Sequence, residues 1–410
     1  MGVGIEAIGV YVGRACLDVR RLFSARGLDT RRFGNLMMEQ KSVNLPCEDP
    51  VTNAVNAAKP LVDALSEDER GRIEAVIVGT ESGLDFGKPI STYIQDYLRL
   101  PRNCRSFEVK HACYGGTAAL QTAAALAAAT PIAGGKALVV AADAASTIDR
   151  HSYWEPSQGA GAVAMLVGDD PRVLELDQGA SGFHSYEVMD TLRPRPDLEA
   201  GDSDLSLLSY LHCLEESYAM YASRVQGCDF AGTFDYLVFH TPFAGMVKGA
   251  HRRLMHKLTS AQPDEIERDF ARRLAPSLVY CSKVGNVYSA ALYLALCSLV
   301  SHVELDGPKR VGLFSYGSGC ASEFYSGVLS PAAPATLGAV RISEAIESRH
   351  ELTMEEYELV SELSLGRMAG VRDEVPDPAP YGSVYGKCLD GQGLLVLDRI
   401  ASFHRTYRWS

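Results

Sequence analysis

Short runs of aliphatic residues alternate along this chain with longer stretches of small and apolar residues. The short runs predict buried strands, and they cover residues 75–79, 137–142, 236–239 and 310–314. The longer stretches, residues 117–129 and 290–301, are apolar on nearly all sides of a helix, which is typical of helices inside a protein. Alternating strands and helices predict an α/β fold with much of its sheet buried on both faces.

The two halves of the chain repeat these features in one order. In each half a strand leads to a polar residue, a second polar residue precedes an apolar helix, and a glycine-rich segment follows. The polar pairs are Glu81 with Cys113 and His240 with Asn286. The repetition predicts two related α/β halves, residues 1–168 and 169–410, packed face to face. A chance likeness between common strand–turn–helix units is the alternative.

Three proline-rich stretches interrupt the pattern of the second half. They are residues 193–204, 331–334 and 373–380. Their lack of periodicity predicts loops inserted between core elements, and long loops of this kind often cover a site.

The composition is that of a soluble globular protein, because 47% of the 410 residues are hydrophobic and 22% are charged. With 39 Lys and Arg against 51 Asp and Glu, the formal net charge is −12, which argues against nucleic acid as the main partner. The ten cysteines are scattered and form no CxxC pair, so we expect reduced thiols, no metal site and a cytoplasmic location. The N-terminus shows no signal-peptide pattern, and the alanine-rich run at residues 118–133 is too weakly apolar to span a membrane.

Cys113 is the sharpest chemical feature of the sequence. It follows a predicted strand end, FEVKH, and precedes two glycines and an apolar helix. A thiol at a helix N-terminus meets free backbone N–H groups and the positive end of the helix dipole, which favours the thiolate. Gly115 and Gly116 would let backbone approach the thiol or its ligand closely. Cys113 is therefore a candidate nucleophile, with a buried structural cysteine as the alternative.

Three further polar residues stand after predicted strands or before a helix. Glu81 follows a buried strand and is a candidate general base, although solvated loop glutamates are common at such positions. His240 follows another strand and suits a proton donor or oxyanion partner, unless it is a satisfied core histidine. Asn286 could hold a carbonyl or hydroxyl group, or cap the helix that follows it. The GxGxxG, GxxxxGK[ST] and GxSxG patterns are absent, which disfavours nucleotide binding and serine hydrolysis.

Five motifs in one order give the sequence a family resemblance. They are ACYGGTAAL (112–120), GAGAVAMLVG (159–168), FHTPFAGMVK (239–248), GNVYSAALY (285–293) and FSYGSG (314–319). Together they resemble the 3-hydroxy-3-methylglutaryl (HMG) synthases of the thiolase superfamily. The resemblance implies an α/β thiolase fold with five layers, αβαβα, two pseudo-duplicated halves, a homodimer, and no metal or redox cofactor.

The resemblance also implies roles for individual residues. Cys113 matches the family's nucleophile, Glu81 its catalytic glutamate and His240 its catalytic histidine. The substrate-binding candidates are Asn286 and Ser318, which match acceptor-binding positions, and Ser206, whose surroundings match less closely.

The implied reaction is a condensation of two acyl thioesters. The Cys113 thiolate takes an acetyl group from the first, and Glu81 removes a proton from the acetyl methyl group. Donors near the helix N-terminus, including the Cys113 backbone N–H, would stabilise the enolate. The enolate carbon attacks the β-ketone of a second acyl thioester, which His240 polarises, and hydrolysis then frees the product from Cys113.

Two departures from the family pattern bear on the substrates. Animal-type enzymes that use coenzyme A carry lysines shortly after FHTPF that help to hold its phosphates. This chain has Gly245 and Gly249 there, with only Lys248 nearby. Residues 90–116 and 394–410 resemble a branch of the family from polyketide pathways. That branch adds a β-branch to a β-ketoacyl chain on an acyl carrier protein and draws the acetyl group from a second carrier protein.

Other functions are alternatives to this interpretation. A coenzyme A-dependent HMG synthase of isoprenoid metabolism would use the same catalytic residues. A non-catalytic thiolase-fold scaffold that binds carriers is the alternative outside enzymes. A decarboxylating ketosynthase fits less well, because those enzymes pair histidine with histidine or asparagine and lack the context of Glu81.

Carrier proteins are small and acidic, so a net-negative enzyme needs local basic patches to dock them. The candidate arginine pairs are Arg31–Arg32, Arg252–Arg253 and Arg272–Arg273. A solvated helix face is the commoner role for any single pair. We expect no nucleic-acid or membrane partner.

Overall fold

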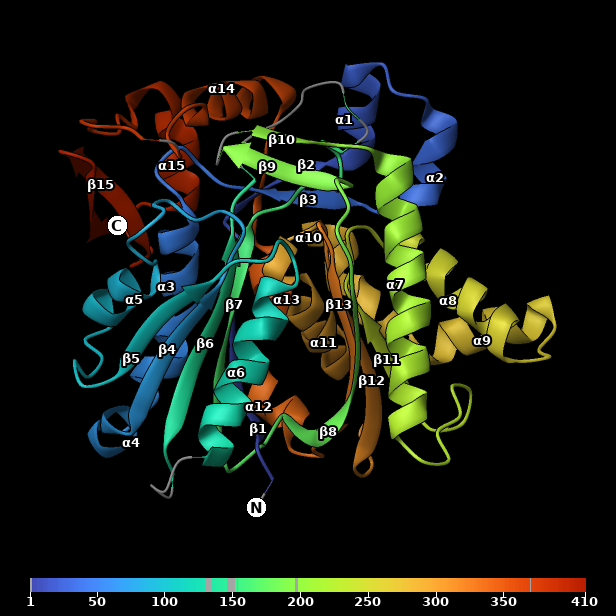
Figure 1. Ribbon diagram of the computed structural model, residues 1–410. Helices are drawn as coiled ribbons and strands as arrows, with labels where there is room; N and C mark the ends of the chain where they lie inside the picture. The colour runs from blue at the N-terminus through green and yellow to red at the C-terminus, as the bar shows by residue number, and fades with distance from the viewer. Residues whose placement is uncertain (1, 130–133, 146–151, 153, 196–197, 369) are drawn as a thin grey trace.

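The central sheet of the molecule is built from strands of both halves of the chain (Figure 1). The computed structural model describes residues 2–129, 134–145, 152, 154–195, 198–368 and 370–410. Within these residues the strand order is β11-β12-β13-β8-β1-β7-β6-β4-β5. Strands of the first half are β1 (Gly4–Tyr11), β4 (Ile73–Gly79), β5 (Arg105–Val109), β6 (Lys136–Asp143) and β7 (Gly161–Gly168). Strands of the second half are β8 (Leu174–Ser185), β11 (Tyr236–Phe239), β12 (Lys309–Gly317) and β13 (Ala321–Leu329).

The four strands predicted from aliphatic runs are confirmed as parts of β4, β6, β11 and β12. β4 is parallel to β5 and β6, and β11 is parallel to β12, whereas β7 and β13 run antiparallel to their neighbours. The strands of the two halves meet where β1 pairs with β8, through Gly4 with Glu175 and Ile5 with Leu174. Figure 1 shows both parts of the sheet extending upward from this junction near the N-terminus.

Helices on and between the two parts of the sheet give the molecule five layers (Figure 1). In the middle, α6 (Gly115–Ala129) packs against β4 to β7 and α11 (Ala291–His302) packs against β11 and β12. On the outer side of the first part, α3 (Pro50–Asp63) packs against β1, β6 and β7. On the outer side of the second part, α7 (Ser203–Arg224) packs against β8 and β13, beside α8 (Ala244–Leu258). The α/β class and the αβαβα layers are confirmed.

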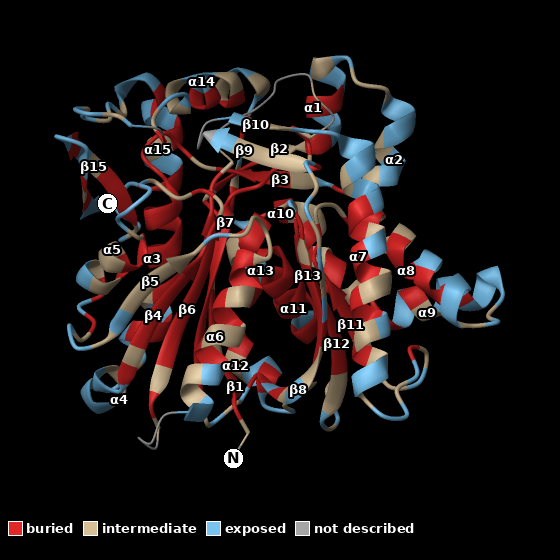
Figure 2. Ribbon diagram, viewed as in Figure 1, coloured by how far each residue is buried: buried red, intermediate tan, exposed pale blue. Residues whose placement is uncertain are grey.

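The two central helices differ in how far they are buried. All residues from Ala291 to Val300 of α11 are buried, as its apolar composition predicts. In contrast, α6 is buried along one side, and Figure 2 shows half-buried and exposed residues along the rest of it. Ala125, Ala128 and Ala129 are exposed. The prediction that this helix is buried on nearly all sides is wrong for the single chain, which leaves an apolar strip of α6 uncovered.

Smaller elements surround this framework. A second sheet contains β14 (His350–Glu351), β2 (Ala15–Asp18) and β3 (Gln40–Val43), and a C-terminal hairpin contains β15 (Leu395–Ala401) and β16 (His404–Trp409). The remaining helices before the second half are α1 (Val19–Arg26), α2 (Phe33–Leu36), α4 (Glu67–Gly71) and α5 (Ser91–Tyr97). The remaining helices of the second half are α9 (Pro263–Arg273), α10 (Val279–Val284), α12 (Ala333–Gly338), α13 (Ile342–Glu347), α14 (Met354–Ser364) and α15 (Gly382–Cys388).

The predicted loop at residues 193–204 is wrong in most of its described part. It contributes to a hairpin of β9 (Thr191–Arg195) and β10 (Leu198–Gly201), and α7 begins at Ser203. Asp202 caps α7, because its carboxylate accepts hydrogen bonds from two backbone N–H groups of the first turn. The stretch at residues 331–334 runs into α12, where Pro334 occupies the first turn that tolerates it. Most of residues 373–380 is a loop, as predicted.

Among the described residues, no helix is both long enough and apolar enough to cross a membrane.

Candidate active site

A cavity of about 920 Å³ lies where elements from both halves meet. The six residues predicted to act on or bind substrate all line it, and they are Glu81, Cys113, Ser206, His240, Asn286 and Ser318. They come from separate elements: three follow the ends of β4, β11 and β12, two precede central helices, and one lies in the first turns of α7. The fold therefore brings together residues that are up to 237 positions apart, from Glu81 to Ser318.

Cys113 and Glu81 are in direct contact at the floor of this cavity. The Cys113 thiol donates a hydrogen bond to Glu81 Oε2, with the sulfur 3.4 Å from the oxygen. Burial raises the pKa of Cys113 well above its usual value, and the negative charges of Glu81 and Asp143 raise it further. The prediction that the helix terminus favours the thiolate is therefore wrong for the empty site. α6 begins two residues later, at Gly115, and burial together with the nearby Glu81 carboxylate raises the Cys113 pKa.

Glu81 itself has the properties of a base that works near neutral pH. Burial raises its pKa to about 8, the Arg193 guanidinium opposes this shift, and the charges of Asp143 and Glu199 add to it. A carboxylate with such a pKa is a stronger base than a solvated one, and a substantial fraction is ionised at slightly alkaline pH. Glu81 is thus a buried carboxyl with a raised pKa and not a solvated loop glutamate.

The chain around Cys113 is fixed by tight backbone contacts. Ala112 has a φ of 40°, in the left-handed region that side chains other than glycine rarely adopt. A Cβ on Gly116 would lie 2.2 Å from the carbonyl oxygen of Ser289. Gly116 therefore lets the first turn of α6 approach the backbone of Ser289, just before α11, and the close approach to the thiol predicted for the two glycines stays a prediction.

Asp143 is the central structural residue of the site, and sequence reasoning missed it. It is the last residue of β6 and fully buried. One of its carboxylate oxygens accepts hydrogen bonds from the Thr80 hydroxyl, the Glu81 N–H, and the N–H and hydroxyl of Ser82, at 2.8 to 3.0 Å. The other accepts from the N–H of Ser289 at 2.9 Å and from its hydroxyl. An aspartate that ends the buried run ALVVAAD, parallel to the strand before Glu81, was the available signal.

His240 is buried at the start of the loop after β11. Its backbone N–H donates to the Phe314 carbonyl at 2.7 Å, and its carbonyl accepts from the Tyr210 hydroxyl at 2.7 Å. Burial lowers the pKa of His240 to about 3, so the imidazole is neutral at physiological pH. A neutral ring carries one N–H that can donate to a carbonyl oxygen in the cavity.

The substrate-binding candidates occupy the walls of the cavity. Asn286 Oδ1 accepts the Tyr288 N–H at 2.9 Å, and the Asn286 backbone pairs with Ser157 and Gly159. Ser206 lies in the second turn of its helix and Ser318 in the turn between β12 and β13. Both serines line the cavity, within reach of a bound molecule.

The β9–β10 hairpin adds two charged residues that sequence reasoning did not single out. Arg193 of β9 places Nη2 3.3 Å from Glu81 Oε1 and also 3.3 Å from Glu199 Oε2 of β10. Their side chains are nearly buried, at 9% exposure for Arg193 and 12% for each carboxylate. The sequence predicted that residues 193–204 cover a site. That part of the prediction is confirmed, because residues of both β9 and β10 line the cavity.

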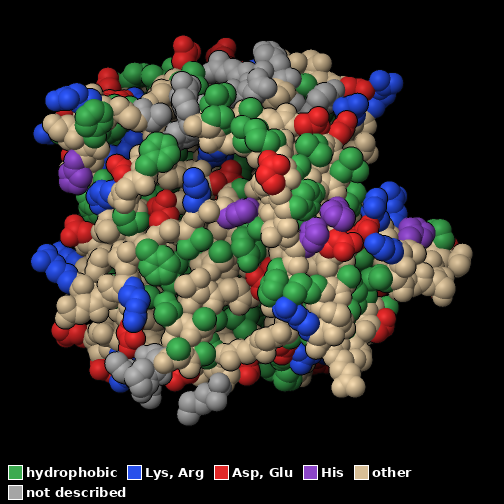
Figure 3. Space-filling view, viewed as in Figure 1, with side chains coloured by type: hydrophobic (Ala, Val, Ile, Leu, Met, Phe, Trp, Pro, Cys, Tyr) green, Lys and Arg blue, Asp and Glu red, His purple; other side chains and the backbone are tan. Residues whose placement is uncertain are grey.

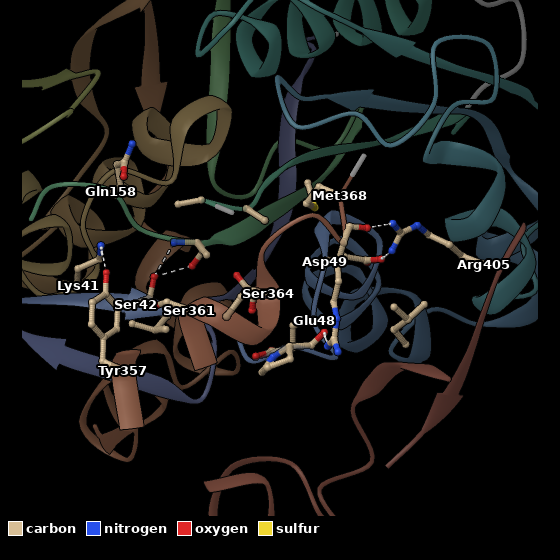
Figure 4. A pocket seen from close by; sticks show the side chains of 18 residues that line it. Lys41, Ser42, Glu48, Asp49, Gln158, Tyr357, Ser361, Ser364, Met368 and Arg405 are labelled. Carbon is tan, nitrogen blue, oxygen red and sulfur yellow. Dashed lines mark hydrogen bonds and ion pairs between the residues drawn. The ribbon is translucent and has the colours of Figure 1, made fainter. Parts of the chain in front are cut away.

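A second, smaller cavity of about 40 Å³ lies beside the first (Figure 4). Its buried Lys41 donates to the carbonyl of Glu155 at 2.6 Å and lies 3.4 Å from the Tyr357 hydroxyl. Burial lowers the pKa of Lys41 to about 8. Gln158 lines both cavities, and its amide nitrogen donates to Glu199 Oε2 at 2.9 Å. The two cavities therefore share one hydrogen-bonded wall.

The three arginine pairs proposed for carrier docking differ in what they offer. Arg32 is exposed at the mouth of the main cavity. Arg252 is exposed, whereas the Arg253 guanidinium pairs with Glu215. Arg273 is fully buried, and its guanidinium binds Asp269 and the Phe230 carbonyl. The prediction that Arg272–Arg273 docks a carrier is therefore wrong for Arg273, whose role is structural.

Among the described residues, no group of three or more His, Cys, Asp or Glu side chains is placed to hold a metal ion.

Comparisons with known proteins place this geometry in a family. A family model of the N-terminal part of hydroxymethylglutaryl-coenzyme A synthase matches residues 1–172, and one of the C-terminal part matches residues 174–269 and 265–368. The polyketide biosynthesis 3-hydroxy-3-methylglutaryl-ACP synthase PksG of Bacillus subtilis is 50% identical, over 100% of this chain and 99% of its own. The hydroxymethylglutaryl-CoA synthase of Enterococcus faecalis is 37% identical, over 87% of this chain and 91% of its own.

Solved structures agree with the sequence comparisons. The HMG synthase of the curacin biosynthetic pathway, in complex with an apo donor-ACP, superposes with a TM-score of 0.96 at 53% identity, and the match covers 100% of both chains. MvaS in complex with 3-hydroxy-3-methylglutaryl coenzyme A superposes with a TM-score of 0.86 at 32% identity, over 100% of this chain and 99% of its own.

The contact between Cys113 and Glu81 predicts the reactivity of the thiol. Because the Glu81 charge adds to burial in raising the Cys113 pKa, Glu81→Gln should lower that pKa. Cys113 should then react with iodoacetamide several-fold faster above pH 8, where Glu81 of the wild type is mostly ionised, since the thiolate is the reactive form. Peptide mass analysis across a pH series measures the rate.

Cys104 serves as the internal control for this experiment. Burial alone raises its pKa, with no contribution from Glu81, so its rate should be the same in both proteins. Equal or slower alkylation of Cys113 in the variant would contradict the electrostatic assignment.

Proposed function

This chain belongs to the hydroxymethylglutaryl-CoA synthase family, and we propose that its substrates are carried on acyl carrier proteins in polyketide biosynthesis. As a member of that family it is a condensing acyltransferase. In the proposed reaction an acetyl group on Cys113 adds to the β-ketone of a β-ketoacyl carrier protein. Hydrolysis then yields a 3-hydroxy-3-carboxymethyl acyl thioester, which carries the β-branch.

The observation that carries this proposal is the full-length likeness to polyketide HMG synthases, which exceeds the likeness to coenzyme A enzymes. Packing around α8 supports it. A Cβ on Gly245 would lie 1.7 Å from the Asn35 carbonyl oxygen, so α2 leaves no room there for a phosphate-binding lysine. Lys248, the one lysine nearby, pairs with Glu267 instead.

The proposed acylation starts from the neutral thiol of Cys113. Its sulfur attacks the thioester carbonyl carbon, the bond to the carrier sulfur breaks, and the thiol proton ends on the departing carrier thiol. Loss of the proton in the cavity is made difficult by burial and by Glu81. The attacking thiolate is therefore formed only as the thioester is engaged, which protects the free enzyme from unwanted alkylation.

The proposed carbon–carbon bond formation follows at the same sulfur. Glu81, 3.4 Å from Cys113 Sγ, removes a proton from the acetyl methyl group, and the electron pair moves to the enolate oxygen. The enolate carbon attacks the β-carbonyl carbon of the second thioester. The neutral His240 donates its N–H to that carbonyl oxygen and stabilises the alkoxide that forms. Water then cleaves the bond to Cys113. These steps use only side chains of this protein, and we propose no resident metal or redox cofactor.

Two substitutions separate the first step from the second. Cys113→Ala should form no acyl-enzyme, because it removes the nucleophile. Glu81→Ala should still be acylated but form no carbon–carbon bond, because it removes the base. Intact-protein mass after incubation with the acetyl donor measures acylation, and the mass of the acceptor carrier measures condensation.

The donor is tested in the same assay. Acetyl transfer to Cys113 should be faster from an acetyl-carrier protein than from acetyl-coenzyme A. Preference for acetyl-coenzyme A would instead favour the isoprenoid-type enzyme. Condensation at the wild-type rate by Glu81→Ala or by Cys113→Ser would overturn the assigned roles, and the latter would revive a scaffold function.

We propose that carriers dock at the mouth of the main cavity. Exposed Arg32 and Lys110 line this mouth, and Asp204 is the acidic residue exposed beside them. Figure 3 shows Lys and Arg side chains in small separate groups over the visible face, with no single large basic patch. A few cations at the mouth can attract an acidic carrier to a protein whose net charge is −12.

Charge reversal tests this docking site. Arg32→Glu combined with Lys110→Glu should raise the KM for the acetyl-carrier protein by on the order of tenfold, because like charges oppose the encounter. The kcat should change little, and the wild-type KM should rise with added salt. Steady-state kinetics measure both. Arg172→Glu, in an exposed pair with Asp170, is the matched control, and an equal effect there would refute a local docking site.

We also propose a homodimer, in which a second copy covers the region around β5 and α6. β5 ends the sheet with one edge unpaired by any described strand, and α6 packs against it. The apolar strip of α6 described above is uncovered. Phe86, in the loop after Glu81, is 100% exposed, although burying such a ring in an interface would be strongly favourable.

Sedimentation measures the oligomeric state. The wild type should have twice the chain mass of 44.3 kDa, and Phe86→Asp should shift the equilibrium toward the monomer. Phe403→Asp, in the turn between β15 and β16, removes a ring that is 58% exposed and should leave the mass unchanged. A wild type that sediments as a monomer would refute the homodimer.

A further inference from the structure

Arg193 is the one cation placed against the carboxylate of Glu81 in the described structure. It reaches Glu81 from the β9–β10 hairpin, which the chain folds over the site from the second half. Nη1 donates to the Ser82 hydroxyl at 2.8 Å, so the guanidinium is also held from the strand end that carries Glu81. The guanidinium lies 5.0 Å above the Tyr288 ring, a distance at which a cation is attracted to the ring face.

A second carboxylate shares the same nitrogen of Arg193. Glu199 Oε2 lies 3.3 Å from Nη2, the distance that separates Nη2 from Glu81 Oε1. Glu199 is held in place by the Gln158 amide at 2.9 Å and by the Tyr288 hydroxyl at 3.3 Å. One guanidinium NH2 group, which has two N–H donors, therefore bridges two nearly buried carboxylates, only one of which contacts the nucleophile.

We propose that Arg193 is a positioning residue that is shared between Glu81 and Glu199 and sets when Glu81 acts as a base. Paired with Glu81, it favours the ionised form of that carboxylate and orients it toward the acetyl group on Cys113. Paired with Glu199, it keeps a partner after Glu81 has been neutralised. This inference rests on the proposed function, because it assigns Glu81 the proton abstraction.

The charge balance of the proton transfer explains why two carboxylates are useful. When Glu81 takes the methyl proton, the C–H electron pair goes to the enolate oxygen, so one negative charge leaves Glu81 and appears on the substrate. Arg193 would then be a nearly buried cation beside a neutral acid, which is costly without another partner. Glu199 supplies that partner at a distance already present in the structure. No large movement of the hairpin is needed.

Several other groups face Glu81 and must be considered in any pH effect. They are Cys113 before α6, Asp143 at the end of β6 and Tyr288 before α11, with Lys110 and His240 on the walls of the same cavity. Burial keeps Tyr288 protonated, because it raises the pKa of that hydroxyl well above its usual value. His240 is neutral for the reason given above. Once Cys113 carries an acetyl group it no longer titrates, which leaves Arg193, Glu199 and Asp143 as the charges closest to Glu81.

The test is the pH dependence of condensation by enzyme that has already been acetylated. Arg193→Met removes a positive charge that lowers the Glu81 pKa, so the rising limb of the rate profile should move up by about one pH unit or more. Glu199→Gln removes a negative charge that raises this pKa, so the limb should move down. Arg193→Lys keeps the charge but loses the fork of donors, and its limb should lie between wild type and Arg193→Met.

Controls separate this inference from a structural effect and from the proposed function. Arg172→Met and Asp170→Asn remove the two charges of an exposed pair and should leave the limb where it is. Loss of folding would lower the rate at every pH. It would not move the rising limb up in Arg193→Met and down in Glu199→Gln. The inference would be overturned if the rate rose at the same pH in wild type, Arg193→Met and Glu199→Gln. Shifts of both variants in the same direction would also overturn it. A wild type that is acetylated but performs no condensation would instead overturn the proposed function.

Discussion

The carboxylate of Asp143 is the interaction on which the geometry of the site depends. It binds the residues on both sides of Glu81 through one oxygen and the start of the α11 segment through the other. Glu81 belongs to the first half of the chain and Ser289 to the second, so a single side chain fixes the relation of the halves where the chemistry occurs. Elsewhere the described strands of the two halves pair at β1 with β8 in the central sheet and at β14 with β2 in the second sheet. The cost of burying the charge is offset by donors on every side of it.

Burial first, and the negative charges buried with it, then govern the acid–base properties of the cavity. Asp143 and Glu199 both raise the pKa of Glu81, and Glu81 raises that of Cys113. Because one guanidinium faces this group of acids, each proton gained or lost changes the balance of the whole site. A neutral His240 completes the arrangement, since it can donate a hydrogen bond without adding a charge.

The sequence contained most of the framework and most of the reacting groups. Aliphatic runs located β4, β6, β11 and β12 because strands buried on both faces need continuous apolar residues. Glu81, Cys113 and His240 were found because each stands at the end of such a run or before a glycine-rich helix start.

The β9–β10 hairpin was missed, because its pairing depends on contacts with the rest of the site and its composition is typical of a loop. Arg193 and Asp143 were missed for a related reason, since their importance lies in distances between segments that are far apart in the chain. The ionisation of Cys113 was mispredicted because a local argument from the helix terminus omits the burial of the thiol and the Glu81 carboxylate, which comes from the loop after another strand.

The contact between Gly245 and Asn35 limits how this protein could evolve toward another donor. A lysine at position 245 cannot be introduced alone, because even its Cβ would overlap the backbone of α2. Gain of a phosphate contact there would first require a shift or loss of α2, a change that gives no benefit until the lysine follows. In this protein a lysine at position 245 thus depends on two linked mutations, and selection acting on single substitutions would cross such a barrier only rarely.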